Sequence, residues 1–402
     1  MYNTSTKLQG LFVRKAIVLA GLMALIFSCI TGTVYGQDYS TTAPAAPDTA
    51  AKKNAVKEVL KKLNLSGTIR MRYTASFTKR VDVTGMQHSS DDPSFTENDF
   101  NIPQARLVAQ RNITDKLSIY LRANFGDFAF LPQGRVLEYA YTNFAFNDYL
   151  NVRAGLSKPF FGREDDISQD FLKSFDYSNQ YNLFSLNGWT SYQLGVTVFG
   201  EVKLSEIPVR YYLGVFNGNG RIDFGDNENG KVFPARIEVD LDENFLIGLN
   251  GGWGREFDKT VKVWGADVNF QRNLTPRFQY EIEAEYKQGN NQNMFLSQIV
   301  PIRPWDNFKA RGFYILPSVE YKLHGRPGMG LEASFKYEYL DPDFKVDGNV
   351  WQEFVPLIGM DFAPDFDIRL QVGAVFDRFK RSIENSVTFN CDRFITQLQL
   401  RF

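Results

Sequence analysis

Apolar and polar side chains alternate along much of this chain, most plainly at its C-terminal end. The last ten residues place large apolar side chains at alternate positions: Phe394, Leu398, Leu400 and Phe402. Arginine and glutamine take most of the positions between them: Arg393, Gln397, Gln399 and Arg401. A period of two is typical of a β-strand with one apolar and one polar face. Because the pattern recurs and no long apolar stretch follows residue 36, the sequence predicts a transmembrane β-barrel, with one face of each strand in lipid and the other facing a watery lumen.

The N-terminus has the pattern of an export signal. Lys7, Arg14 and Lys15 precede an apolar run over residues 16–30, and a small-residue site follows at residues 34–36. We therefore expect residues 1–36 to be a signal peptide that is removed. A membrane anchor is the alternative, although the run is short for a helix that must span about 20 residues. Export together with a barrel predicts the outer membrane of a Gram-negative bacterium, with outer-membrane lipid around the strands.

The predicted domain organisation has three parts. After the signal, residues 37–51 are rich in Ser, Thr, Ala and Pro and suggest a linker. Residues 52–63 combine five lysines with apolar residues at helical spacing, which predicts a short periplasmic helix. Residues 37–63 thus form a linker and helix, and residues 64–402 the barrel.

Composition excludes some functions. Removal of residues 1–36 leaves 42 Lys and Arg against 46 Asp and Glu, so nothing indicates a basic surface for nucleic acid. Aromatic residues make up 15% of the chain, which suits the girdles that a barrel places at both membrane interfaces. Cys391 is the only cysteine after the signal, so no internal disulfide is expected.

The alternation predicts sixteen antiparallel strands. They lie near residues 65–79, 102–112, 117–128, 134–146, 149–158, 190–203, 207–217, 231–242, 245–255, 262–273, 277–289, 309–323, 329–341, 351–362, 367–380 and 391–402. Every other connection is short, as periplasmic turns are in bacterial barrels. Sixteen strands leave an aqueous channel rather than a packed core. We therefore expect a porin, open to small hydrophilic solutes.

The third outer connection, residues 159–189, is the longest. It mixes aromatic residues, Phe160, Phe161, Phe171 and Phe175 among them, with many charged residues. We therefore expect it to fold into the lumen; a surface loop is the alternative. Its predicted selectivity residues, with the lysine before it, are Lys158, Arg163, Glu164, Asp165, Asp166 and Asp170.

Charges on the predicted inward faces are unevenly distributed. Arginines fall on the first eight strands: Arg70, Arg72, Arg106, Arg122, Arg153, Arg210 and Arg236. Glutamates line the predicted strand at residues 277–289: Glu281, Glu283 and Glu285. We expect an arginine sector opposite a glutamate sector, with the acidic loop facing the arginines. Pores lined by a ring of basic side chains favour anions, and pores lined by a ring of acidic side chains favour cations. The alternative is that these residues only make the lumen polar and select no ion.

One segment resembles a known family. Residues 141–164 carry Gly155, Lys158, Pro159, Phe161, Gly162 and Glu164, similar to the signature of the phosphate-selective porin O and P family, with the proline one place early. Residues 213–220 resemble the family's glycine-asparagine turn. The resemblance implies a sixteen-stranded barrel, usually a homotrimer, that admits anions such as phosphate. Family selectivity depends on clustered lysines and an arginine ladder; with only Lys158 and Lys173 near this acidic loop, phosphate selectivity does not follow.

Other functions fit the sequence less well. A barrel enzyme would need a histidine constellation, whereas His88 and His324 fall on opposite ends of the predicted barrel. A non-conducting scaffold or adhesin, with the outer loops as its working surface, remains the main alternative. No covalent chemistry, cofactor or metal is expected, because the acidic clusters lie in outer loops that water or surface cations can satisfy.

Overall fold

The computed structural model describes residues 63–92, 94–126, 136–219, 229–256, 258–298, 303–325, 328–362 and 367–402. The predicted signal peptide, the linker and nearly all of the predicted periplasmic helix lie outside these residues. None of the helices in the described ranges is long and apolar enough to cross a membrane.

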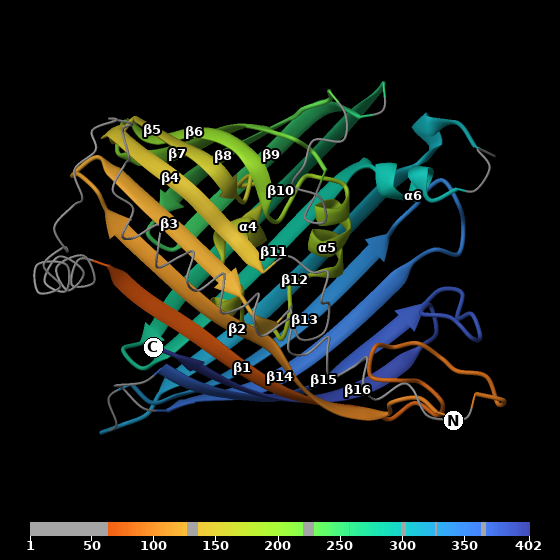
Figure 1. Ribbon diagram of the computed structural model, residues 1–402. Coiled ribbons are helices and arrows are strands. Elements are labelled where there is room, and N and C mark those ends of the chain that lie inside the picture. Colours follow the sequence, from red (N-terminus) through yellow and green to blue (C-terminus); the bar gives the residue numbers. More distant parts are fainter. Residues whose placement is uncertain are drawn as a thin grey trace, which may run out of the picture. The chain divides into compact units, whose positions relative to one another are not determined.

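Sixteen antiparallel strands form a closed barrel in which the last strand pairs with the first (Figure 1). The strands are β1 Asn64–Ser76, β2 Asn98–Asn112, β3 Leu117–Asn124, β4 Leu137–Asn147, β5 Leu150–Ser157, β6 Gln193–Leu204, β7 Ile207–Phe216, β8 Val232–Asp242, β9 Phe245–Glu256, β10 Lys259–Thr275, β11 Phe278–Asn290, β12 Lys309–Lys322, β13 Gly330–Asp341, β14 Trp351–Phe362, β15 Asp367–Phe379 and β16 Cys391–Arg401. The predicted fold class is confirmed. β3 ends at Asn124, short of the predicted residue 128, and the predicted start of the fourth strand lies outside the described residues.

Alternation sets which side chains face outward. On β1, Ile69 and Met71 are 39% and 47% exposed, whereas Arg70 between them is 2% exposed. Ile69 is in register with Leu400 of β16, and Arg70 with Gln399. A shift of one residue would turn every apolar side chain into the lumen, so the pattern fixes this register.

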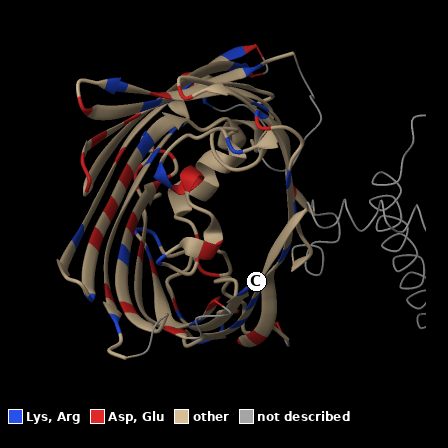
Figure 2. Cartoon of the chain, turned by 90° about the vertical axis from the view of Figure 1, so that its left-hand side faces the viewer, with Lys and Arg blue, Asp and Glu red and all other residues tan. Residues whose placement is uncertain are grey.

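The longest connection between strands lies inside the barrel. Residues 158–192, called the L3 loop below, join β5 to β6 and contain α4 Arg163–Asp166, a 3₁₀ turn Gln169–Phe171 (η1) and α5 Asn179–Leu186. Figures 1 and 2 show these helices within the ring of strands. Two further short helical elements, α6 Gln292–Leu296 and η2 Trp305–Asn307, belong to the connection between β11 and β12.

Two apolar clusters pack the L3 loop against the inner wall. Phe161, Phe184 and Trp189 are fully buried against residues of β7, β8, β10 and β12. Phe175 is buried against inward-facing aliphatic side chains of β14, β15 and β16: Val355, Leu357, Val375 and Ile395. These aliphatic residues interrupt the polar inner face where the loop covers it, because apolar area removed from water stabilises the docked loop.

Candidate functional site

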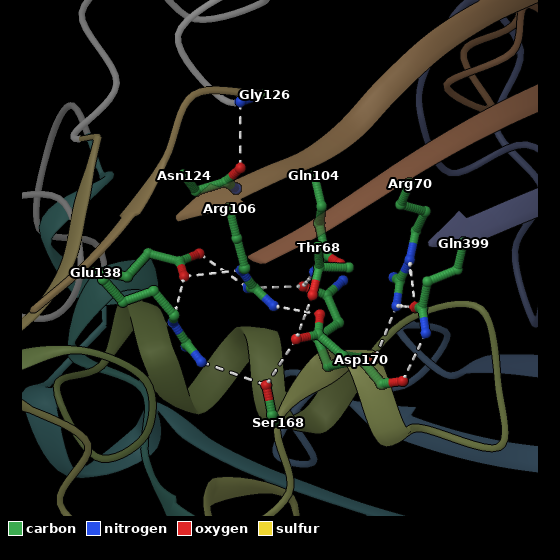
Figure 3. A network of polar contacts seen from close by, with 12 residues as sticks. Thr68, Arg70, Gln104, Arg106, Asn124, Gly126, Glu138, Ser168, Asp170 and Gln399 are labelled. Atoms are coloured by element: carbon green, nitrogen blue, oxygen red, sulfur yellow. Dashed lines mark hydrogen bonds and ion pairs between the residues drawn. The ribbon is translucent and has the colours of Figure 1, made fainter. Parts of the chain in front are cut away.

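The L3 loop is held to the first two strands by a buried polar network (Figure 3). Asp170 pairs with Arg106 of β2 at 2.9 Å and accepts a hydrogen bond from Thr68 of β1 at 3.1 Å. Arg106 also pairs with Glu138 at 2.8 Å, and Glu138 pairs with Arg122 of β3 at 2.8 Å. All three wall residues are at most 4% exposed. Charges so buried need partners, so these contacts hold the loop in place.

Arginines of β1 bind the L3 backbone as well as its carboxylates. Arg70 donates to Gln169 O at 2.7 Å and to Phe175 O at 3.4 Å. Arg72 binds Asp176 through two hydrogen bonds, at 2.7 and 3.0 Å. Such a bidentate contact fixes both the distance and the relative orientation of the guanidinium and the carboxylate.

The opposite wall binds the same loop with reversed charges. Arg163 pairs with Glu283 at 3.3 Å, and Lys173 pairs with Glu281 at 2.7 Å. Both glutamates lie on β11. The L3 loop therefore spans the lumen, presenting acids to the arginine sector and bases to the glutamate sector.

Three of the predicted loop residues form hydrogen bonds with the backbone of the loop itself. Glu164 accepts from Ser178 N at 2.7 Å, and Asp165 accepts from Ser191 N at 3.0 Å. Lys158 is 1% exposed and donates to Glu164 O at 3.1 Å. All three side chains are buried, so their polar atoms bind the loop rather than open solvent.

The remaining predicted arginines lie on the inner wall. Arg236 forms an ion pair with Asp267 and lies 3.7 Å from Asp166. Arg210 pairs with Glu238 at 2.7 Å. Arg153 of β5 instead lies over aromatic rings, 4.5 Å from the ring centroid of Tyr141.

Several partners were not identified from the sequence. Three of these partners complete the loop contacts: Glu138, Asp176 and Gln399. The alternation of the sequence does not single out Glu138, because the pairing of β3 with β4 shifts its register after Arg122. Asp176 could have been found as one more acid of the loop, and Gln399 from its inward position in the last strand.

A cavity of about 560 Å³ lies beside the L3 loop, toward the outer ends of β13–β16 and β1. Its lining includes three basic and three acidic side chains: Arg72, Lys336, Arg393, Asp176, Glu353 and Asp377. Asp377 is held by Arg393 at 2.6 Å and by the Trp351 indole at 2.9 Å. Among the described residues, no group of histidine, cysteine, aspartate and glutamate is arranged to hold a metal.

Sequence comparison assigns the chain to a family. A model of the family "phosphate-selective porin O and P" matches residues 79–311, more than half of the chain. The chain belongs to the phosphate-selective porin O and P family. No curated protein sequence matches closely enough to add a relative.

Solved structures share the fold of this porin O and P family member. The outer-membrane channel DcaP of Acinetobacter baumannii is 12% identical over 85% of this chain and 97% of its own, with a TM-score of 0.53. The anion-selective porin of Comamonas acidovorans is 9% identical over 84% and 98%, with a TM-score of 0.53. OmpT of Vibrio cholerae, described in a trimer form, is 11% identical over 85% and 99%, with a TM-score of 0.51.

Family and fold together confirm the predicted function. The chain is an outer-membrane porin of a Gram-negative bacterium, through which small hydrophilic solutes diffuse passively. This is the architecture of a channel rather than of an enzyme. The lysine that matches the family signature, Lys158, is the first residue of the L3 loop and is buried.

Proposed function

We propose that the L3 loop is the constriction of this porin, that the remaining path favours small anions, phosphate among them, and that the barrel works as a homotrimer. The observation that carries the proposal is the loop's double attachment: Asp170 and Asp176 bind arginines of β1 and β2, and Arg163 and Lys173 bind glutamates of β11. A segment tied at both sides of the lumen reduces the cross-section open to solutes.

The proposed anion preference is modest, because most charges near the loop are already paired. The cavity beside the loop is lined by equal numbers of basic and acidic groups. Arg70, Arg72, Arg106, Arg122, Arg210 and Arg236 all have hydrogen-bond or ion-pair partners. In the part of the chain that the structure describes, Arg153 has neither an ion pair nor a hydrogen bond. An uncompensated positive charge on the wall attracts anions and repels cations, so we assign the anion preference to Arg153.

The homotrimer is proposed from the family and from the fold shared with OmpT, whose structure is described in a trimer form. Mass measurement of the protein in detergent, with the bound detergent subtracted, tests it. A monomeric mass at concentrations where the barrel is folded would contradict it.

Reversal potentials in a planar bilayer with a salt gradient test the constriction and its charge. We expect the wild type to conduct with chloride more permeant than potassium, and Arg153→Glu to lower that ratio. Lys116→Glu, which reverses a charge in an exposed periplasmic turn, is the matched control. An Arg153→Glu channel with the wild-type reversal potential would remove Arg153 from the selectivity site, and a wild-type barrel without conductance steps would contradict the pore itself.

A further inference from the structure

Five aromatic rings form a belt on the inner face of the barrel beside the start of the L3 loop: Tyr120, Tyr141, Phe160, Phe199 and Tyr212. Tyr120 of β3 and Tyr141 of β4 are in register and stack with ring centroids 5.2 Å apart and planes at 10°. Phe199 of β6 and Tyr212 of β7 are also in register, with centroids 6.1 Å apart and planes at 14°. Phe160 of the L3 loop stacks on Tyr212 at 4.6 Å. We call these five residues the aromatic belt.

The belt faces the lumen rather than the lipid. Tyr141 pairs with Gly155, two residues along β5 from Arg153, so both side chains lie on the same face of the sheet. Exposed apolar residues of the same strands, such as Phe144 and Leu213, occupy the opposite face. All five belt residues are partly exposed. The need for aromatic girdles at the membrane interfaces, which explains outward rings, does not explain these inward ones.

Arg153 lies in the middle of the belt. Its guanidinium carbon is 4.5 Å from the centroid of Tyr141, 4.8 Å from that of Phe160 and 5.3 Å from that of Phe199. Its Nε is buried and has no hydrogen-bond acceptor. The rings hold the cation by its face. Its terminal amino groups have no hydrogen-bond partner among the described residues, which leaves them available for an oxyanion.

Backbone geometry positions the belt at some cost. Phe160 has φ of 59°, a conformation that costs a residue with a side chain about 1 kcal/mol, and it brings the ring onto Tyr212. Gly155 has φ of 127°, and a Cβ there would collide with the backbone of β4 at Ala140. Gly155 pairs in turn with Gly195 of β6, so no side chain stands beside Tyr141 on these two strands.

We propose that the aromatic belt and Arg153 form a binding site for flat anionic solutes, namely aromatic carboxylates. The rings offer faces on which an aromatic solute stacks, and Arg153 supplies the positive charge for its carboxylate. A sugar also stacks on aromatic rings, but it carries no charge to pair with Arg153. The inference rests on the proposed pore and names a substrate class for it.

Titration of the channel current with sodium benzoate tests the site. We expect benzoate to block the potassium chloride current of the wild type at lower concentration than sodium cyclohexanecarboxylate, which has the same charge but no flat ring. Tyr141→Leu and Tyr212→Leu should each raise the half-blocking benzoate concentration about fivefold, the loss of one stacked ring. Arg153→Gln should abolish the preference for benzoate over neutral benzamide.

Phe144→Leu is the matched control, because it removes an aromatic ring from the lipid face of the strand that carries Tyr141, and it should leave the benzoate block unchanged. Isothermal titration of each folded variant with benzoate in detergent provides a readout that needs no current. Folding is checked by the heat-dependent mobility shift of the barrel on electrophoresis.

The proposal would be overturned by equal block from benzoate and cyclohexanecarboxylate, by unchanged block in folded Tyr141→Leu and Tyr212→Leu, or by glucose blocking as well as benzoate. A wild type that conducts potassium chloride without a response to benzoate would contradict this inference and leave the pore standing. A wild-type barrel that conducts no current but binds benzoate in the titration would contradict the proposed pore and leave the binding site standing.

Discussion

Asp170 of the L3 loop and Arg106 of β2 form an ion pair at 2.9 Å whose arginine side chain is 2% exposed. The same guanidinium pairs with Glu138 on the other side. Arg106 therefore has a wall partner and a loop partner, and only the second depends on the position of the loop. The two contacts can be separated by mutation, because loss of Asp170 leaves the wall pair intact.

Asp170→Asn should loosen the L3 loop without unfolding the barrel. Removal of one partner from a buried ion pair costs about 3 kcal/mol, and here that cost falls on loop docking. We expect more open-channel current noise and faster proteolysis within residues 158–192. The control is Asp347→Asn, which breaks an exposed pair with Lys380 and should change neither. Wild-type noise in Asp170→Asn would show that the apolar clusters alone hold the loop.

A charge swap tests the attachment to the opposite wall. Arg163→Glu and Glu283→Arg should each lower the temperature at which the barrel loses its folded electrophoretic mobility, because each places like charges at a contact of 3.3 Å. The double swap restores opposite charges and should recover stability, with a coupling free energy of about 1 kcal/mol. Additive losses in the double variant would contradict a direct contact between these residues in solution.

The sequence predicts the barrel better than it predicts the loop contacts. A period of two determines which way Arg70 and Ile69 face, and short turns separate neighbouring strands, so local pattern specifies most of the fold. The match of Arg72 with Asp176, 104 residues apart, depends instead on the path of the L3 loop through the lumen, which no periodicity encodes.

The sequence predicts that the acidic residues of the loop face the arginine sector, but it does not predict which of them contact it. Asp170 is in direct contact with Arg106, whereas Glu164 and Asp165 bind backbone amides within the loop. Burial of a carboxylate requires donors close by, and the sequence does not show which carboxylates become buried. Whether the predicted residues set ion selectivity stays a prediction.

Gly162→Ala should disturb the docking of the L3 loop. Gly162 has φ of 111°, and a Cβ there would collide with the side chains of Glu285 and Lys287 on β11, which are themselves paired. Strain and collision together should cost about 2 kcal/mol and lower the thermal midpoint of the mobility shift. Gly251→Ala is the control, since nothing lies within 4 Å of its added methyl group. Equal midpoints for the two variants would contradict the close approach of the loop to β11.

A pH-dependent contact lies in the first outer loop, residues 77–97. The His88 ring binds Asp82 through Nε2 and Asp92 through Nδ1, both at 2.8 Å, and stacks on Phe95. Hydrogen bonds to these carboxylates raise the pKa of His88 above its usual value of about 6.5. The protonated ring is the form that binds both acids, so its stabilisation of the loop is complete below the unfolded pKa and is lost as pH rises through the higher folded pKa.

Histidine-labelled NMR in detergent measures that pKa directly, because the chain has only two histidines. His88→Asn removes one signal and thereby assigns both. We expect the His88 signal to titrate above pH 6.5, and Asp92→Asn to move its midpoint downward, since one of the two stabilising carboxylates is then gone. A His88 midpoint at or below the usual value in the wild type, or one that Asp92→Asn leaves in place, would show that the ring is not held between the two acids in solution.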